Sequence, residues 1–230
     1  MNPETLAVSE IFESVQGEGP SAGTPSVFLR LSLCNLRCSF CDTPYTWDFK
    51  RFDRAREVRE MTIDEVRDVI TGFRAGNLVL TGGEPLLQAE GIARLLERLP
   101  AMRTEVETAG TLLPGAALDA RIDQWNVSPK LASSENPLHR RIRTEVLTHF
   151  AASPRATFKF VVCGEADLAE IDALVERFGI DRRRVILMPE GRDAATLAAR
   201  GRVLVPHCIA RGYRYGHRLH VVLFGDERGT

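Results

Sequence analysis

Three cysteines, Cys34, Cys38 and Cys41, lie within eight residues and have the clearest chemical meaning of any side chains in the chain. A structural zinc site normally closes its tetrahedron with four ligands, and no histidine precedes His139. A 4Fe–4S cube held by three cysteines keeps one iron free to bind a small molecule. The spacing therefore favours an iron–sulfur cluster. A group of free thiols, or a zinc site completed by a distant cysteine, stays open as an alternative.

Three further segments combine polar or glycine residues directly after predicted strands: residues 81–85, 107–110 and 128–130. In the first of them, Gly82 and Gly83 carry no side chain, so the backbone can approach a ligand closely. Functional residues of parallel sheets gather at the carboxyl ends of the strands. We therefore expect these three segments and the cysteine loop to open on one rim.

Short apolar runs that alternate with helical patterns must position these segments. Strands are expected over residues 26–33, 77–81, 105–108, 124–127, 157–162, 185–188 and, last, 218–224. Amphipathic helices are expected over 61–73, 166–178 and around Ile92 to Leu99. This alternation predicts an α/β fold with a mainly parallel sheet and outer helices. No linker or change of composition interrupts it, so one domain over residues 1–230 is expected.

The composition narrows the class of ligand and the compartment. Thirty basic and thirty-one acidic residues give a formal charge of −1, which argues against nucleic acid as a partner and favours a small-molecule substrate. No apolar run approaches the roughly 18 residues of a membrane span, so no membrane partner is expected. The five cysteines are an odd number and do not indicate a disulfide framework. A reducing cytoplasm fits these features.

The cysteine and glycine motifs together resemble those of the radical S-adenosylmethionine superfamily. Cys34, Cys38 and Cys41 match its C-x3-C-x2-C cluster motif, and Gly82-Gly83-Glu84 matches its glycine-rich segment. The resemblance implies a partial β/α barrel in which the open iron binds the amino and carboxylate groups of S-adenosylmethionine. One electron would then cleave the sulfonium to a 5′-deoxyadenosyl radical, so the cofactor supplies the radical chemistry and the protein positions it.

The N-terminal segment makes the resemblance narrower. Residues 11–19, residues 28–30 and the triplet Cys41-Asp42-Thr43 closely resemble the 7-carboxy-7-deazaguanine synthases. The likeness runs from Val8 to about Lys130 and continues more loosely to residues 224–226. It implies a lyase that converts 6-carboxy-5,6,7,8-tetrahydropterin to 7-carboxy-7-deazaguanine with loss of ammonia, on the route to queuosine-type deazapurines. It further implies magnesium, a reductant such as flavodoxin or ferredoxin, and a homodimer.

The same resemblance assigns site residues but no catalytic residue beyond the cofactor radical. The substrate would contact Val15, Gln16, Gly17, Glu18, Arg30 and Thr81. S-adenosylmethionine would contact Gly83, Glu107, Ser128, Pro129 and Lys130. Cys34, Cys38 and Cys41 would hold the 4Fe–4S cluster. Thr43 would ligate a magnesium ion that the substrate carboxylate also binds.

The residue types suit these roles. A carboxylate such as Glu18 can accept the paired N–H groups of a pterin edge. The planar fork of Arg30 matches the substrate carboxylate, and a threonine hydroxyl is an oxygen ligand of the kind magnesium prefers. From the residues alone, the alternatives are an exposed Glu18 in a flexible glycine loop, a surface Arg30 on an edge strand, and Thr43 as a turn hydroxyl.

The chain departs from the family at several positions, and two other functions stay open. Ala109 stands where many members have asparagine, and Cys163 and Cys208 match no cluster position. No substrate contact can be assigned to residues 131–154 or to the extreme C-terminus. A radical activating enzyme that acts on a protein glycine would share the cysteine spacing without needing the Gln16–Glu18 loop. A non-enzymatic module would hold zinc at the cysteines.

Overall fold

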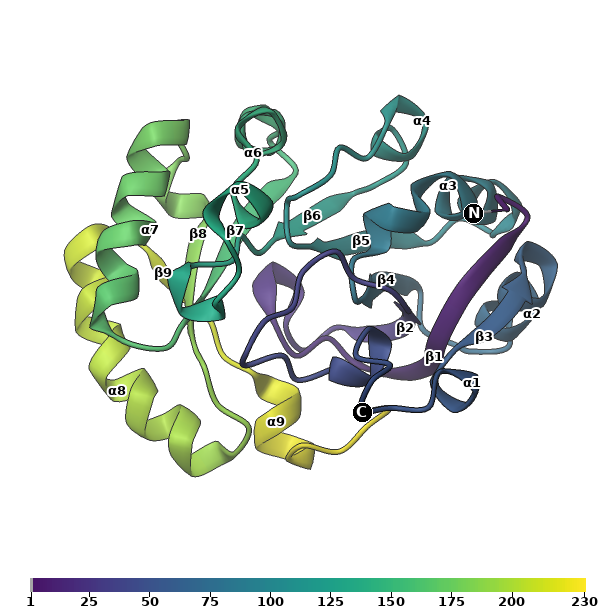
Figure 1. Ribbon diagram of the computed structural model, residues 1–230, viewed down its shortest axis with the longest axis horizontal. Helices are drawn as coiled ribbons and strands as arrows, with labels where there is room; N and C mark the ends of the chain where they lie inside the picture. The colour runs from purple at the N-terminus through teal and green to yellow at the C-terminus, as the bar shows by residue number, and fades with distance from the viewer. Residues whose placement is uncertain (1) are drawn as a thin grey trace.

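The protein is described here by a computed structural model of residues 2–230, in which nine strands form one curved sheet (Figure 1). The strands are β1 (Thr5–Val15), β2 (Pro25–Leu31), β3 (Arg59–Thr62), β4 (Asn77–Gly82), β5 (Arg103–Thr108), β6 (Gln124–Val127), β7 (Ala156–Val162), β8 (Val185–Pro189) and β9 (Arg214–Tyr215). Their order across the sheet is β3-β1-β2-β4-β5-β6-β7-β8-β9.

Most of the sheet is parallel. From β2 to β9 every neighbouring pair is parallel, whereas β1 pairs antiparallel with both β2 and β3. Strands β3 and β9 form the two edges, so the sheet stays open as a partial barrel. The predicted α/β class with a mainly parallel sheet is confirmed.

Helices surround the outer side of the sheet, while the cysteine loop and α9 lie toward its middle (Figure 1). The helices are α1 (Arg54–Glu57), α2 (Ile63–Thr71), α3 (Ala89–Arg98), α4 (Ala116–Asp119), α5 (Leu138–Arg141), α6 (Thr144–Ala152), α7 (Glu165–Phe178), α8 (Ala194–Arg211) and α9 (Leu219–Phe224). No helix within residues 2–230 is both long and apolar enough to cross a membrane.

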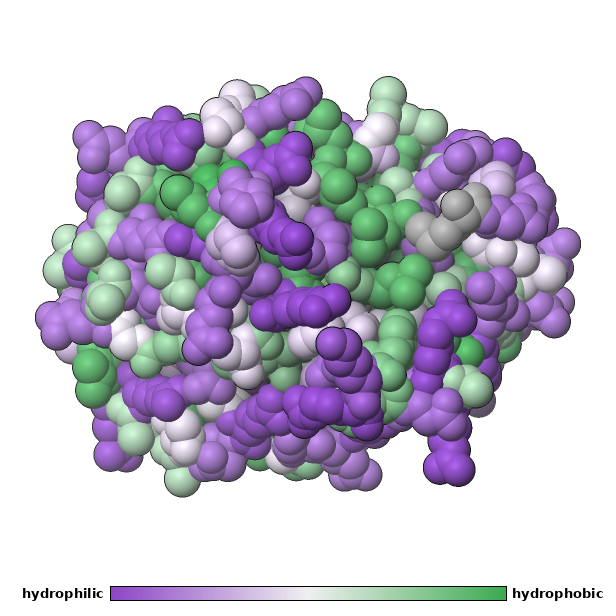
Figure 2. Space-filling model, viewed as in Figure 1, coloured by the Kyte–Doolittle hydropathy of each residue, from purple (hydrophilic) through white to green (hydrophobic). Residues whose placement is uncertain are grey.

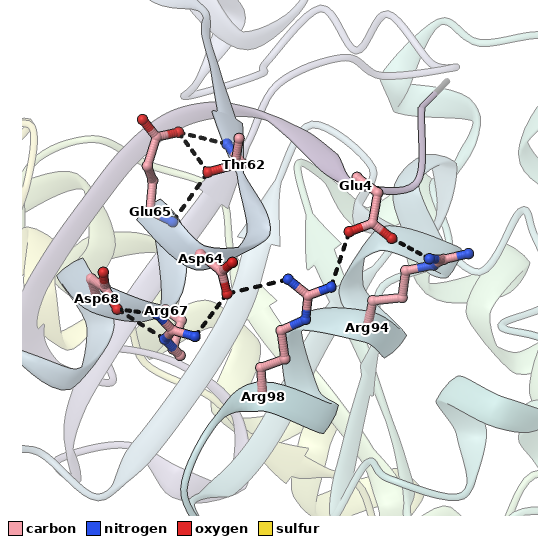
Figure 3. Close-up of polar contacts among 8 residues, drawn as sticks. All are labelled: Glu4, Thr62, Asp64, Glu65, Arg67, Asp68, Arg94 and Arg98. Carbon is pink, nitrogen blue, oxygen red and sulfur yellow. Dashed lines mark hydrogen bonds and ion pairs between the residues drawn. The ribbon is translucent and has the colours of Figure 1, made fainter.

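The start of α2 has the capping box that its sequence predicts. The Thr62 hydroxyl accepts from the Glu65 backbone N–H, and the Glu65 carboxylate accepts from the Thr62 backbone N–H (Figure 3). Each contact satisfies a donor that the helix would otherwise leave free. Arg98, at the end of α3, donates to Asp64 of α2 and to Glu4 beside β1 (Figure 3). These contacts connect α3 to α2 and to the residue that precedes β1.

The parallel strands supply the centre of the core, because both of their faces are covered. Trp125, Phe158 and Phe160 are fully buried on β6 and β7, and Leu78 and Leu80 are fully buried on β4. Strands buried on both faces appear in the sequence as continuous apolar runs. This explains why the predicted strands 77–81, 124–127, 157–162 and 185–188 agree closely with β4, β6, β7 and β8.

The expected last strand over residues 218–224 is wrong. Residues Leu219–Phe224 form helix α9, and the sheet ends at the two-residue strand β9. Periodicity cannot separate strand from helix in a run this short. Within α9 only Val221 is buried, whereas Val222, Leu223 and Phe224 are exposed. The Leu219 backbone N–H donates to the Gly17 carbonyl at 2.9 Å, so the segment crosses to the N-terminal loop rather than extending the sheet.

Candidate active site

One pocket lies at the carboxyl ends of the parallel strands and encloses about 1590 Å³ of empty space, its open mouth included. It gathers every site residue predicted from the sequence except Pro129. The residues brought together are Val15, Gln16, Gly17, Glu18, Arg30, Cys34, Cys38, Cys41, Thr43, Thr81, Gly83, Glu107, Ser128 and Lys130. The four segments expected to share a rim do so, while the roles of the individual residues stay predictions.

The cysteine loop follows β2 and is held by segments distant in the sequence. Leu33 takes a positive φ of 76°, and its backbone N–H donates to the Thr46 carbonyl at 2.7 Å. The Arg37 backbone N–H donates to the Asn136 side-chain oxygen at 2.8 Å. The Ser39 backbone N–H donates to the Ser134 carbonyl at 3.2 Å. Residues 134–136, for which the sequence indicated no role, therefore brace this loop.

Each of the three cysteine sulfurs accepts one N–H group. The donors are the Leu36 backbone to Cys34 at 3.4 Å, the Asn136 amide to Cys38 at 3.4 Å and the Trp47 indole to Cys41 at 3.3 Å. Hydrogen bonds to the ligand sulfurs are one way in which proteins adjust iron–sulfur clusters. This donor set therefore fits a cluster bound through thiolates.

Two of the three thiols are harder to ionise in the folded protein than in solution. Burial raises the pKa of Cys34 to about 12 and also raises the pKa of Cys38, so cluster binding must displace these protons. Within residues 2–230, no three His, Cys, Asp or Glu side chains lie close enough together to hold a single metal ion.

The two glycines after β4 permit a close approach, but to the chain itself. A Cβ at Gly82 would lie 2.0 Å from the Leu31 carbonyl oxygen, and one at Gly83 would lie 2.0 Å from the Leu33 carbonyl oxygen. Gly82 also has a φ of 133°. Side chains at these positions would separate the end of β4 from the start of the cysteine loop. The two glycines therefore allow the end of β4 to lie close to the start of the cysteine loop. Their closeness to a ligand stays a prediction.

Glu84 is fully buried and joins the ends of β4 and β5. Its carboxyl group accepts from the Leu86 backbone N–H, the Thr108 hydroxyl and the Ala109 backbone N–H, at 3.1, 2.8 and 2.8 Å. Burial raises the pKa of this carboxyl despite these donors. The contact at Ala109 is made by the backbone N–H, so it does not depend on the side chain at this position.

Strands β2, β4 and β5 present neighbouring polar side chains to the pocket. Arg30 and Thr81 are direct partners in the β2–β4 register. The Thr81 hydroxyl donates to one oxygen of Glu107 at 2.7 Å, and the Gln16 amide donates to the other at 3.3 Å. Glu107, predicted to contact S-adenosylmethionine, thus connects two residues predicted to contact the substrate.

Arg30 is held by the antiparallel strand beside it and is not a surface residue. Its Nε donates to Glu10 of β1 at 2.8 Å, and Tyr45 donates its hydroxyl to the same oxygen of Glu10 at 3.0 Å. Burial raises the pKa of Tyr45 to about 12, so its phenol stays a donor at neutral pH. The guanidinium also lies 5.7 Å from the centre of the Phe12 ring. Its orientation is therefore set before any ligand binds.

Glu18 is largely buried and lies between two cations. Its side chain is 12% exposed; one oxygen pairs with Lys159 of β7, and the other accepts from Arg218 Nε at 3.0 Å. Burial alone would raise the pKa of Glu18, but the positive charges of Lys159 and Arg218 outweigh it and lower that pKa. The alternative of an exposed glutamate in a flexible loop is wrong.

The remaining predicted residues lie around the cluster end of the pocket. Lys130 donates to the carbonyl and the hydroxyl of Ser128 at 2.9 and 3.0 Å. Thr43 precedes the short 3-10 helix Pro44–Thr46 but does not cap it with its side chain. Its hydroxyl lies 3.8 Å from the Cys41 sulfur.

Several charged residues of this pocket, chiefly Lys159 and Arg218, were not predicted from the sequence. Lys159 is buried and is the only charged residue of β7, and this isolated charge in a mainly apolar run was the available signal. Arg218 adjoins α9, which was expected to be a strand, so its contacts could not be anticipated. Figure 2 shows that this face of the molecule is largely hydrophilic, with apolar patches between the hydrophilic side chains. Residues 225–230, which follow α9, line the pocket.

Comparison with known proteins agrees with this geometry. Residues 30–150 match the model of the Radical SAM superfamily. The 7-carboxy-7-deazaguanine synthase of Pyrobaculum aerophilum is 38% identical, over 97% of this chain and 97% of the relative. That of Rhodopirellula baltica is 40% identical, over 98% of this chain and 89% of the relative. The crystal structure of QueE from Escherichia coli superposes with a TM-score of 0.69 at 25% identity, covering 94% and 95% of the two chains.

Proposed function

We propose that this chain, which belongs to the 7-carboxy-7-deazaguanine synthase family of the radical S-adenosylmethionine superfamily, performs the reaction of that family in the pocket described above. The reaction contracts the ring of 6-carboxy-5,6,7,8-tetrahydropterin to 7-carboxy-7-deazaguanine and releases ammonia, in queuosine-type deazapurine biosynthesis. The observation that carries the proposal is the convergence of the cysteine loop, the glycine segment and the Val15–Glu18 loop on one pocket.

Cys34, Cys38 and Cys41 would hold the 4Fe–4S cluster. When bound, the cluster and S-adenosylmethionine supply a 5′-deoxyadenosyl radical that abstracts hydrogen from the substrate. Gly83, Glu107 and residues 128–130 would hold S-adenosylmethionine on the β4–β6 side of the pocket. The carboxyl ends of these strands would keep the cofactor beside the cysteine loop, and the buried Glu84 keeps the β4 and β5 ends together.

The substrate would lie between the Val15–Glu18 loop and β2. Arg30 is orientated by Glu10 and would present its outer nitrogens to the substrate carboxylate as a planar fork. The pterin edge would contact the side chains of Gln16, Glu18 and Thr81. It would also contact the backbone of Val15 and Gly17. Glu18 stays ionised between Lys159 and Arg218, so it can only accept hydrogen bonds.

Thr43 would ligate a magnesium ion together with the substrate carboxylate. Its hydroxyl is free of a capping contact and lies next to Cys41. A substrate carboxylate placed there would meet the negative charge of the thiolate cluster, and a divalent cation would offset that repulsion.

The electron donor and the compartment are proposed from the chemistry of the cluster, and the homodimer is proposed from the family resemblance. The cluster needs a one-electron donor, for which flavodoxin or ferredoxin is the proposed class. The reducing cytoplasm is the proposed compartment, because it would preserve the cluster. A homodimer is the proposed assembly. The two other functions, a glycine-activating enzyme and a zinc module, are not favoured, because the curated relatives over nearly the whole chain carry the synthase name.

The proposed function is tested by anaerobic incubation of the reconstituted protein with S-adenosylmethionine, a reductant and 6-carboxy-5,6,7,8-tetrahydropterin. Mass spectrometry is expected to find 7-carboxy-7-deazaguanine. The Cys38→Ala variant is expected to form none, while Cys208→Ala, whose sulfur lies outside the pocket, keeps the activity. Consumption of the pterin without this product would refute the proposal.

Magnesium is tested separately with Thr43→Val, which removes the hydroxyl at nearly constant volume. Turnover of the parent protein is expected to rise with magnesium concentration, and the variant is expected to lose most of that response while its cluster absorbance is unchanged. An identical magnesium response in both proteins would remove Thr43 from the site.

A further inference from the structure

Arg218 connects the two loops that would hold the two reacting partners. Its side chain is only 8% exposed, and its three nitrogens donate to three different segments. Nε donates to Glu18 at 3.0 Å, Nη1 donates to the Gly191 carbonyl at 2.7 Å, and Nη2 pairs with Asp42. Glu18 belongs to the loop proposed to hold the pterin, and Asp42 lies between the last cluster cysteine and Thr43.

We propose that Arg218 is a positioning residue that fixes the pterin loop, Val15–Glu18, relative to the cysteine loop, residues 33–43. The proposal rests on the function proposed above. It adds that Arg218 influences what fraction of the radicals formed reaches the substrate. Hydrogen abstraction requires the substrate and the radical to meet within a narrow range of distance, and a misplacement of about 1 Å can cost on the order of 100-fold in rate.

The other contacts of the pterin loop do not perform this task. Gln16 connects the loop to Glu107 of β5, which lies on the sheet and not on the cysteine loop. Lys159 connects Glu18 to β7. The Leu219 N–H next to Arg218 reinforces the same attachment by donating to Gly17 at 2.9 Å. Residues 218–219 thus contact residues 17–18, and the Arg218 side chain also pairs with Asp42 of the cysteine loop.

The chemistry of the side chain explains why arginine is needed. Charges alternate in sign along Asp42, Arg218, Glu18 and Lys159. The last three are buried, the Asp42 side chain is 43% exposed, and each charge has an opposite neighbour. A lysine at position 218 would keep the positive charge. Its single nitrogen cannot reproduce a planar fork aimed at three segments, so the charge would remain while the geometry loosened.

The test compares Arg218→Lys with Arg211→Lys, anaerobically and after cluster reconstitution. Arg211 also donates to a carboxylate, that of Asp172, at 2.9 Å, but it lies outside the pocket. Three quantities are measured: iron content, the dissociation constant of 6-carboxy-5,6,7,8-tetrahydropterin for the cluster-free protein, and the ratio of 5′-deoxyadenosine to 7-carboxy-7-deazaguanine. A parent protein that forms no deazaguanine would refute the proposed function before any variant is compared.

Arg218→Lys is expected to retain its iron and to bind the pterin within about threefold of the parent. Its ratio of 5′-deoxyadenosine to product is expected to rise by about tenfold or more, because radicals would form without reaching the substrate. The ratio in Arg211→Lys should equal that of the parent. An unchanged ratio in Arg218→Lys, or an equal rise in Arg211→Lys, would overturn the proposal.

Asp42→Asn provides a second variant if Arg218→Lys loses its iron. It weakens one arm of the fork and leaves the contacts to Glu18 and Gly191 in place, and the same rise in the ratio is expected. Loss of iron from both variants would also overturn the proposal, because the contact would then serve to hold the cysteine loop itself.

Discussion

Each cysteine sulfur of the cluster loop has its own N–H donor, and two of these donors are side chains. Trp47 and Asn136 were not expected at the site, because nothing in their local sequence connects them with the cysteines. Asn136 lies 98 residues from Cys38 in the chain. The cysteines themselves could be recognised because their chemistry depends on spacing within one short loop. Their donors could not, because only the folded chain brings them together.

The Trp47 contact predicts an electrochemical effect. Trp47→Phe removes the N–H donated to Cys41 and keeps an aromatic ring. A donated N–H stabilises the more negative, reduced cluster, so its loss should lower the midpoint potential by about 20–60 mV, from the usual worth of a hydrogen bond. A redox titration followed by electron paramagnetic resonance measures this shift. Trp125→Phe is the control, because its indole donates to Asp119 in the core; an equal shift there would contradict the prediction.

Arg30 gives a prediction on ligand selectivity. Its Nε donates to Glu10, so the side chain is held in one orientation. A lysine at this position would keep the positive charge but lose the planar fork. Arg30→Lys should weaken pterin binding by about 10–100-fold and leave S-adenosylmethionine binding nearly unchanged. Separate calorimetric titrations of the two ligands check this. Equal weakening of both would mean that Arg30 supports the pocket wall and does not recognise the substrate.

At the scale of elements, the end of β4 determines how closely the cysteine loop can lie against the sheet. Gly83→Ala would place a Cβ against the Leu33 carbonyl oxygen, so backbone must move. We expect a loss of about 1–3 kcal/mol in the free energy of unfolding together with reduced iron content. Gly76→Ala, immediately before the same strand, has nothing within 4 Å of its new Cβ and should change stability by less than about 0.5 kcal/mol.

Urea denaturation and iron analysis of the two glycine variants would decide this prediction. Equal stability and iron content would show that the β4 end adapts to a side chain. The physical account of the glycine segment would then be wrong.

The elements that could be predicted are those whose own residues determine them. Strands β4, β6, β7 and β8 are continuous buried runs, and α2 carries its own capping box. Strand β9 has only two residues, too few for any pattern. Helix α9 shares its composition with a strand, and its contact with Gly17 is made across the whole fold. Elements that depend on such distant contacts cannot be recognised from local periodicity.

At the scale of the whole molecule, the pocket joins the two ends of the chain. Glu18 and Arg218 are 200 residues apart, and Glu18 and Lys159 are 141 residues apart. The rim itself could be predicted, because parallel strands place their carboxyl ends together. The charges that connect the rim could not, because each pairs with a partner from another part of the chain.

The charge network makes stability depend on pH with a definite sign. The pKa of Glu18 is lowered in the folded state because Lys159 and Arg218 outweigh its burial. Its stabilising effect is therefore complete above its unfolded pKa of about 4.3 and is lost as the pH falls toward the folded pKa. Glu18→Gln should lose about 3 kcal/mol near pH 7, and its difference from the parent should shrink as the pH falls below about 5.

Urea denaturation of the cluster-free parent and variant over a pH series measures that difference. His220 also faces Glu18, but burial lowers its pKa, so it is neutral near pH 7 and adds charge only on the acid side. A difference that stayed constant from neutral to acidic pH would contradict the assigned ionisation of Glu18.

One pocket is expected to bring together the cluster, S-adenosylmethionine and the pterin. Anaerobic diffraction from crystals of the protein with all three tests this expectation, with anomalous scattering at the iron edge locating the cluster. The iron signal is expected beside Cys34, Cys38 and Cys41, and the pterin density is expected between the Val15–Glu18 loop and Arg30. Iron bound elsewhere, or a pterin outside this pocket, would contradict the account.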